Sequence, residues 1–153
     1  MSTITRFYEA FIRRDHQVMG ACYHDEATFH DPVFGSLNAD QARAMWRMLL
    51  SSSTDLRITY QVLNSTEDGG TAQWDAYYTF SRTGRPVHNS IQATFTFKDG
   101  LILTHHDHFD LWRWSRQALG LSGLLLGWSP IVANKVRGTA RRALDRSMAE
   151  HTP

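Results

Sequence analysis

The chain has 153 residues, of which 42% are hydrophobic, 20% are charged and one is a cysteine, Cys22. This length suits one domain, and the composition is that of a globular protein, which excludes a disordered, collagen-like or coiled-coil chain. A single cysteine excludes an internal disulfide and a multi-cysteine zinc site, and a net charge of +1 argues against a general nucleic-acid binder.

The first third of the chain has the pattern of helices. Apolar residues at helical spacing predict a helix over residues 4–14 and a shorter one over residues 16–23. A short strand over residues 27–30 then ends at Asp31, because the proline that follows favours a turn. Asn38, with a glutamine three residues later, is a capping-box signal and predicts a helix from there to about Leu50.

The middle of the chain changes to the composition of strands. Segments 56–65, 71–83, 87–98 and 101–112 are rich in β-branched and aromatic residues, and turn signals separate them. Four strands with short links predict an antiparallel meander. Helices that precede strands in this way indicate an α+β fold, with N-terminal helices packed on one face of a curved antiparallel sheet. We expect residues 1–120 to form this domain.

The end of the chain is basic and returns to helical spacing. Residues 113–153 carry seven basic and two acidic side chains, whereas residues 1–112 carry nine basic and thirteen acidic ones. Ser129 before Pro130 is a helix-start signal. We therefore expect residues 121–153 to add an apolar connector, Leu121–Trp128, and a basic amphipathic helix to the same domain. This helix either docks on the acidic body or rests on an anionic membrane surface. The chain begins without an apolar signal core, which favours a cytoplasmic protein.

Two ionisable residues interrupt the apolar pattern of the last predicted strand. Strict alternation places His105 and Asp107 on one face with four apolar side chains, those of Leu101, Leu103, Phe109 and Leu111. An unpaired carboxylate is costly to bury, so Asp107 needs a hydrogen-bonding partner or a raised pKa. Asp107 is either a general acid or base in a pocket, tuned by His105, or a structural residue bonded to its neighbours.

Two further aspartates are candidates. In segment 71–83 either face of the strand fits the core, so Asp75 either joins Asp107 in one pocket or is a surface charge. Asp31 lies at a strand end before a proline. It is either a functional carboxylate or the first residue of an Asx-type turn, a common arrangement for this residue pair.

The run HHDHFD over residues 105–110 raises the question of a metal site. His106 and His108 share one strand face, but no second segment carries a ligand motif such as HExxH or CxxC. We therefore expect no metal and no other cofactor, and we interpret these histidines as solvated or interface residues. The chain also has no glycine-rich phosphate loop and no GxSxG nucleophile motif.

The order of the elements resembles the nuclear transport factor 2-like superfamily, which implies a cone-shaped α+β barrel. Residues 6–36, RFYEAFIRRDHQVMGACYHDEATFHDPVFGS, are similar to the opening of bacterial ketosteroid isomerases. The resemblance puts the general base of those enzymes on Asp31. Their oxyanion donors fall on Phe7 and Ala93, which cannot donate a hydrogen bond. The steroid reaction itself is therefore disfavoured unless Tyr8 replaces these donors.

A second stretch, DGLILTHHDHFDL over residues 99–111, resembles the limonene epoxide hydrolase branch of the superfamily. The resemblance implies that Asp107 and Asp75 are the paired aspartates of that branch. Gln73 stands where the branch has a bridging arginine, and Phe29 where it has a water-holding tyrosine. Epoxide hydrolysis is therefore a weakened expectation.

A third stretch, FDLWRWSRQALG over residues 109–120, is similar to the SnoaL-like polyketide cyclases. Together the stretches predict an enzyme without a cofactor, of isomerase, cyclase or epoxide hydrolase type, that acts on a small apolar organic ligand. The catalytic candidates are Asp31, Asp107, Asp75 and His105. The side chains expected to line the pocket are Phe7, Tyr8, Phe11, Phe29, Trp46, Phe95 and Phe109. The alternative is a non-catalytic protein that binds a lipid-like ligand. The superfamily resemblance also implies a homodimer formed through the sheet.

Overall fold

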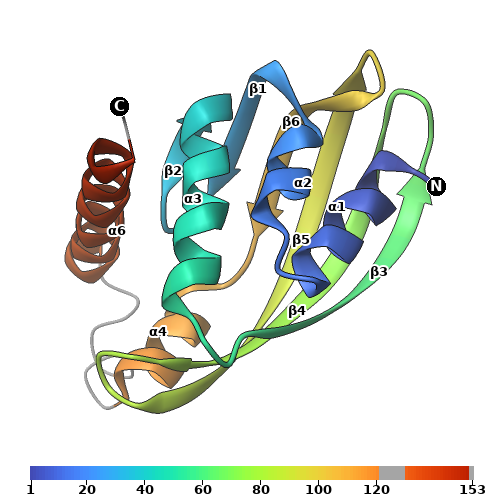
Figure 1. The fold of residues 1–153 in the computed structure, drawn as a ribbon. Helices are drawn as coiled ribbons and strands as arrows, with labels where there is room; N and C mark the ends of the chain where they lie inside the picture. Colours follow the sequence, from blue (N-terminus) through green and yellow to red (C-terminus); the bar gives the residue numbers. More distant parts are fainter. Residues whose placement is uncertain (121–129, 152–153) are drawn as a thin grey trace.

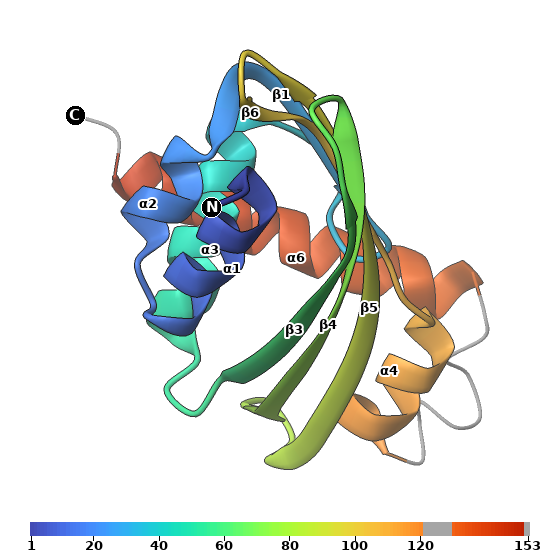
Figure 2. The same ribbon diagram turned by 90° about the vertical axis from the view of Figure 1, so that its right-hand side faces the viewer.

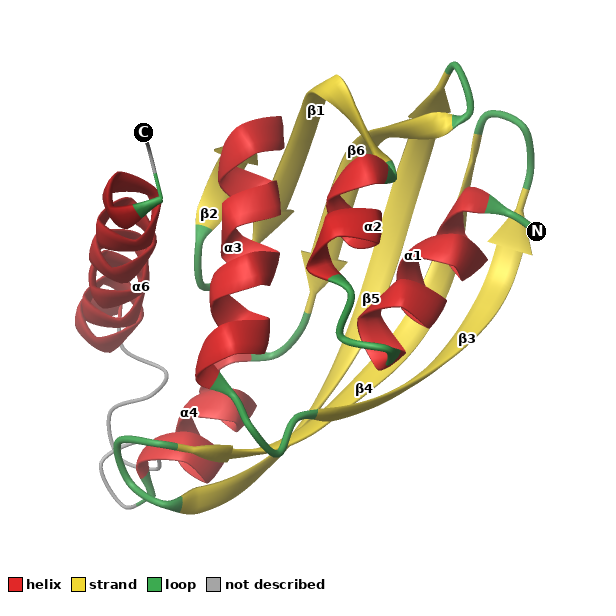
Figure 3. Ribbon diagram, in the orientation of Figure 1, coloured by secondary structure: helices red, strands yellow, loops and turns green. Residues whose placement is uncertain are grey.

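The computed structural model describes residues 1–120 and 130–151 (Figure 1). Its elements are α1 (Thr3–Ile12), α2 (His16–Ala21), β1 (Tyr23–Asp31), β2 (Gly35–Asn38), α3 (Ala39–Ser52), β3 (Arg57–Ser65), β4 (Gly69–Phe80), β5 (Arg85–Lys98), β6 (Leu101–His108), α4 (Leu111–Leu119) and α6 (Pro130–Glu150). The six strands form one curved, unclosed sheet, and α1, α2 and α3 cover its concave face (Figures 2 and 3). The prediction of an α+β fold with helices on one face of a curved sheet is confirmed.

The sheet combines the predicted meander with one parallel pair. Its strand order is β2-β1-β6-β5-β4-β3, and β3 to β6 pair antiparallel in chain order. β1 instead runs parallel to β6 and carries the short, unpredicted β2 on its other side. The sheet is therefore not antiparallel throughout, because the meander ends with a strand that returns beside β1 in the same direction. This pairing brings the end of β1 next to the end of β6.

Local signals explain where the first helices begin and end. Ser2 caps α1, and Asn38 caps α3 in the predicted capping box with Gln41. α1 ends two residues earlier than predicted, because the chain turns at Arg14, whose φ is 61°. The face of α1 that packs on the sheet carries the buried residues Ile4, Phe7, Tyr8, Ala10 and Phe11.

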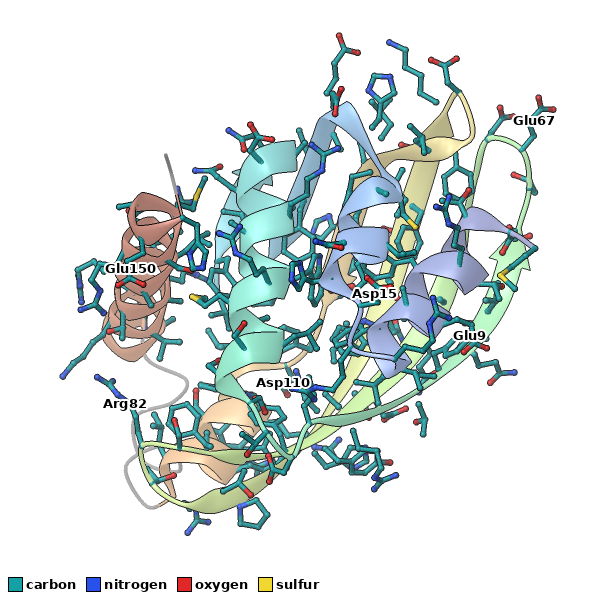
Figure 4. All side chains as sticks on the ribbon, viewed as in Figure 1. Glu9, Asp15, Glu67, Arg82, Asp110 and Glu150 are labelled. Carbon is teal, nitrogen blue, oxygen red and sulfur yellow. The ribbon has the colours of Figure 1, made fainter. Side chains whose placement is uncertain are left out.

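The last strand is shorter than predicted. β6 ends at His108, and Asp110 accepts a hydrogen bond from the backbone N–H of Arg113 at 3.1 Å. Asp110 therefore caps α4 where the sheet ends (Figure 4). The predicted strand over residues 101–112 is wrong beyond His108, because a capping aspartate stops it. Phe109 lies half-buried between the two elements.

A bulge changes which residues of β6 face the helices. Near Leu103 the pairing advances by one residue on β5 and by two on β6. The core face of β6 is therefore formed by Ile102, and the expectation that Leu101 and Leu103 lie on it is wrong. His105 and Asp107 still face the core, because they follow the bulge.

The last two described helices pack at different places. Trp114 of α4 donates a hydrogen bond from Nε1 to the Tyr78 hydroxyl at 2.6 Å. α6 begins at Pro130, as predicted, and packs on α3 with Leu144 fully buried. The predicted connector Leu121–Trp128 lies outside the described residues. No helix in the described part of the chain combines the length and the apolar character needed to cross a membrane.

Candidate active site

Two buried carboxyl groups meet at the ends of β1 and β6. The strands run parallel, with Phe29 opposite His105. Side chains two residues further along each strand return to the same face, so Asp31 and Asp107 are neighbours across a strand spacing of about 4.8 Å. Asp31 is 8% exposed and Asp107 is 2% exposed. The structure therefore brings together two candidates that lie far apart in the sequence.

Asp107 is one end of a buried chain of hydrogen bonds. Its Oδ1 lies 2.9 Å from His105 Nε2, and His105 Nδ1 lies 2.7 Å from the Tyr23 hydroxyl. That hydroxyl accepts a hydrogen bond from Trp46 Nε1 at 2.9 Å. One proton order gives every donor an acceptor: Tyr23 donates to Nδ1, and Nε2 donates to Asp107. In this order His105 is a neutral imidazole and Asp107 is a carboxylate.

A second donor reaches the same carboxyl group. Trp74 Nε1 lies 3.3 Å from Asp107 Oδ1, and two N–H donors on one carboxyl group suit its ionised form. Burial raises the pKa of Tyr23 well above its usual value, although the hydrogen bond from Trp46 opposes this effect. The Tyr23 hydroxyl therefore keeps its proton for His105, and the chain holds a carboxylate beside a neutral imidazole.

Asp31 forms a turn, and the pKa of its carboxyl group is raised. Its Oδ1 accepts hydrogen bonds from the backbone N–H groups of Val33 at 2.9 Å and Phe34 at 2.6 Å, which is the Asx-type turn expected before a proline. Burial raises the pKa of Asp31 to about 7; the hydrogen bond from Phe34 lowers it, and the charge of Asp107 raises it further. A carboxyl group of this pKa exchanges its proton near neutral pH, as a general acid or base must.

Tyr8 brings an unused hydrogen-bond donor into the same interior. Its side chain is fully buried, and its ring stacks on that of Tyr60 with 5.0 Å between the centroids. Its hydroxyl has no hydrogen-bond partner among the described residues. Burial, followed by the charge of Asp107, raises the pKa of Tyr8 well above its usual value, so the hydroxyl keeps its proton. A substrate oxygen would supply the acceptor that this donor lacks.

Aromatic rings surround these polar groups. The expected lining residues that are buried in this core are Phe7, Tyr8, Phe11, Phe29, Trp46 and Phe95. The ring centroid of His105 lies 4.3 Å from that of Phe95 and 5.0 Å from that of Phe29. Phe109 packs at the edge of the same core and is half-buried. Such surroundings exclude water from the carboxyl groups and suit an apolar ligand.

Asp75 does not belong to this site. Trp74 is buried on the face of β4 toward the helices, so Asp75 lies on the opposite face. There its carboxylate accepts a hydrogen bond from the Ser90 hydroxyl and lies 2.9 Å from His88 Nε2. The bond from Ser90 keeps the pKa of Asp75 below its usual value. The expectation that Asp75 joins Asp107 in one pocket is wrong, because the apolar alternate residues of β4 form its inner face.

The remaining histidines of the HHDHFD run also lie on the outer face. The rings of His106 and His108 stack with 3.9 Å between centroids, and His30 lies 4.7 Å from His106. Burial and then the neighbouring His108 lower the pKa of His106. Within residues 1–120 and 130–151, no three His, Cys, Asp or Glu side chains converge in the way that metal ligands do.

Sequence reasoning missed two members of the site, Tyr23 and Trp74. Tyr23 begins β1 and lies on the same face as Phe29 and Asp31. Alternation carried back from Phe29 would have placed it inside, but its bond to His105 depends on the β1–β6 pairing. Trp74 stands on the apolar face of its strand, and choosing that face as the inner one would have identified it.

Two surface hollows lie among the described residues. One, of about 600 Å³, lies among α2, α3 and the end of α6. The other, of about 340 Å³, lies where β4, β5 and β6 meet the start of α4 and is lined in part by Phe109. Neither is lined by Asp31 or Asp107.

Comparison with known proteins agrees with this architecture. A family model for the SnoaL-like domain matches residues 4–105. IdmH from Streptomyces antibioticus, described as a candidate polyketide cyclase, has a TM-score of 0.64 and 23% identity over 78% of this chain and 96% of its own. A candidate isomerase from Bacillus subtilis has a TM-score of 0.63 and 16% identity over 77% and 90% of the two chains. An LEH-like epoxide hydrolase from M. tuberculosis has a TM-score of 0.57 and 14% identity over 86% and 93%. No curated protein matches the chain. These likenesses show the fold, and the reaction has to be argued from the site itself.

Proposed function

The chain belongs to the SnoaL-like family, and from this premise we propose that it is an acid–base enzyme acting on a small, largely apolar molecule held between its helices and its sheet. The observation that carries the proposal is the adjacency of Asp31 and Asp107 in an apolar interior. Two carboxyl groups in unlike surroundings take different roles: Asp31 transfers the proton, and Asp107 acts through its charge. In this proposal, side chains of the protein carry out the proton transfer.

Asp31 is the base in this proposal. Above about pH 7 its carboxylate takes a proton from a carbon next to a carbonyl group of the substrate. The electron pair of the broken C–H bond moves onto the carbonyl oxygen and gives an enolate, to which the Tyr8 hydroxyl donates a hydrogen bond. Where a carbon–carbon double bond adjoins the deprotonated carbon, the enolate is a dienolate, and protonated Asp31 returns the proton to the far end of that double bond, which completes an isomerisation. In the cyclase version, the enolate carbon attacks a second carbonyl group and closes a ring, and the resulting alkoxide takes the proton from Asp31.

The His105–Asp107 pair acts on the base through its charge. Asp107 holds a negative charge beside Asp31, and this charge raises the pKa of Asp31 and makes it a stronger base near neutral pH. Tyr23 and Trp46 fix the orientation of His105, and through it the position of the carboxylate. The hydrogen-bond chain therefore supports the proton transfer without losing a proton of its own.

Proton transfer next to a carbonyl group fits this site better than attack of water on an epoxide. The resemblance to epoxide hydrolases implied that Asp75 shares an interior with Asp107. Asp75 and Gln73 instead lie on the outer face of β4. The reaction class that we propose is therefore of the isomerase or cyclase type.

A non-catalytic binding protein of the same fold is the second candidate. One observation favours it: Phe7 and Ala93, which the isomerase resemblance places at the oxyanion positions, are both buried and neither donates a hydrogen bond. An apolar interior without those donors suits a ligand that is held but not converted.

Hydrogen–deuterium exchange separates the two functions. Exchange of carbonyl-adjacent hydrogen for solvent deuterium is followed by NMR, with cyclic conjugated ketones as probes. We expect Asp31→Asn to lower the catalysed rate by about 100-fold or more and Asp107→Asn to lower it by a smaller factor, while probe binding, measured by tryptophan fluorescence, persists. Asp75→Asn is the matched control and keeps the full rate, because it makes the same chemical change on the outer face. Saturable binding with no acceleration of exchange would assign the chain to the binding function instead.

A further inference from the structure

The C-terminal helix α6 is bonded to the turn that carries Asp31. Arg137 Nε donates a hydrogen bond to the Pro32 carbonyl oxygen at 2.7 Å. Arg141 Nη1 lies within hydrogen-bond distance of two further carbonyl oxygens, at 3.3 Å from that of Phe34 in the turn and 3.0 Å from that of Ser36 in β2. α6 therefore binds three backbone carbonyl groups within the segment that follows Asp31.

The position of these arginines is set by the packing of α6. Residues 137, 141, 144 and 148 follow one another at spacings of four, three and four, which places them on one face of a helix. Leu144 is fully buried in the core, and Met148 packs against it. The two arginines lie on the same helix face, where Arg141 is half-buried and Arg137 is exposed. Their contacts with the turn are therefore held by the seating of the whole helix against the domain.

The charges around Asp31 come from two elements. Asp107 of β6 raises the pKa of the Asp31 carboxyl group, and Arg137 of α6 lowers it. The segment between β1 and β2 contributes the backbone N–H groups of Val33 and Phe34. His105 lies behind Asp107 in the hydrogen-bond chain. Arg137 is therefore the positive group that opposes both burial and the neighbouring carboxylate.

α6 lies outside the family match. The family model matches residues 4–105 and so ends before α4 and α6 begin. A role for α6 has to be argued from its own contacts. Besides its packing on α3, α6 bonds through Arg137 and Arg141 to the segment that follows the proposed base.

We propose that α6 braces the Asp31 turn, and that Arg137 is a positioning residue that holds the Asp31 carboxyl group in place through the Pro32 carbonyl. The effect of this brace on catalysis rests on the acid–base role proposed above, whereas the binding of α6 to the turn does not. If α6 is the brace, the domain that performs the chemistry extends beyond the family match to the last helix of the chain.

The test follows Asp31 without a substrate. The protein is labelled with ¹³C in its aspartate carboxyl groups and titrated by NMR as the full chain, as Arg137→Gln and as the control Arg142→Gln. Arg142 is exposed on the same helix and lies 3.4 Å from the Thr139 hydroxyl, and Arg142→Gln removes the same charge. We expect Arg137→Gln to raise the titration midpoint of Asp31 by about 0.3–0.7 pH unit, and Arg142→Gln to leave it in place.

A second readout reports the geometry of the turn. The backbone N–H groups of Val33 and Phe34 are bonded to Asp31, so their hydrogen exchange should become several-fold faster in Arg137→Gln and remain unchanged in Arg142→Gln. A midpoint or an exchange rate that stays at its wild-type value in Arg137→Gln overturns the brace. Equal changes in the two variants overturn it as well, because they would report only the loss of a charge. Neither result depends on whether the protein catalyses hydrogen–deuterium exchange in a ketone. The brace and the proposed enzymatic function can therefore be refuted independently.

Discussion

Asp31 should weaken the folded protein at neutral pH, so its replacement should stabilise the protein. The carboxyl group is 8% exposed, and burial is the main cause that raises its pKa from 3.8 to about 7. Asp31→Asn removes the ionisable group and keeps a side-chain oxygen for the N–H groups of Val33 and Phe34. The substitution therefore isolates the cost of burying a charge from the contribution of the turn.

The magnitude follows from the difference in pKa. Below pH 3.8 the folded and unfolded states both carry the proton, and the cost is absent. As the pH rises toward 7 the unfolded chain ionises while the folded state keeps its proton, so the free energy of unfolding falls. A difference of about 3 pH units, at about 1.4 kcal/mol for each, gives a cost of about 4 kcal/mol above pH 7 and about 1.5 kcal/mol at pH 5.

Urea unfolding followed by tryptophan fluorescence measures this cost at pH 5 and pH 8. We expect Asp31→Asn to be more stable than the wild type by about 4 kcal/mol at pH 8, with a gap that shrinks to about 1.5 kcal/mol at pH 5. Asp75→Asn is a control for which we expect the opposite change in stability. The lowered pKa of Asp75 in the wild type stabilises the fold at high pH, so the variant should be less stable than the wild type at pH 8. A gap for Asp31→Asn that is absent at pH 8, or equal at the two pH values, would refute the reasoning.

Two further substitutions test the hydrogen-bond chain and the seating of α6. Tyr23→Phe leaves Trp46 Nε1 and His105 Nδ1 without their hydrogen-bond partner. The free energy of unfolding, measured in urea, should therefore fall by about 1–3 kcal/mol. An unchanged value would mean that these hydrogen bonds contribute nothing to stability. Leu144→Ala opens a cavity under α6 and should cost about 2–5 kcal/mol, with faster amide exchange at Phe34. Lost stability with unchanged exchange at Phe34 would show that α6 packs on the domain without holding the turn.

Elements with local signals were predictable from the sequence. The helix after Asn38 has its capping box in four consecutive residues, and α3 begins where those residues place it. The strands β3, β4 and β5 follow the turn signals that separate them, with ends within three residues of those predicted. In each case the information lies within a few neighbouring residues, as it does for caps and tight turns.

The errors arose where the competing signal was weaker or lay elsewhere in the chain. The apolar run that suggested a strand up to residue 112 contains Asp110, and its capping bond decides for a helix. The bulge at Leu103 has no signature in the sequence of β6, because it depends on how β5 and β6 pair. Asp75 was left between two faces, although the tryptophan beside it belongs to the more apolar face.

The acidity of Asp31 is the property least visible in the sequence. Its turn is local and was expected, but a turn of this kind donates hydrogen bonds that lower a carboxyl pKa. The pKa rises to about 7 because Asp31 is buried and because Asp107 carries a charge nearby. Asp107 lies near Asp31 only because β1 and β6 pair in parallel. Since Arg137 then opposes that rise from α6, the proton affinity of this one group depends on three elements that are distant in the chain. A sequence pattern therefore identifies a carboxyl group at this position, and the tertiary fold decides at which pH it acts as a base.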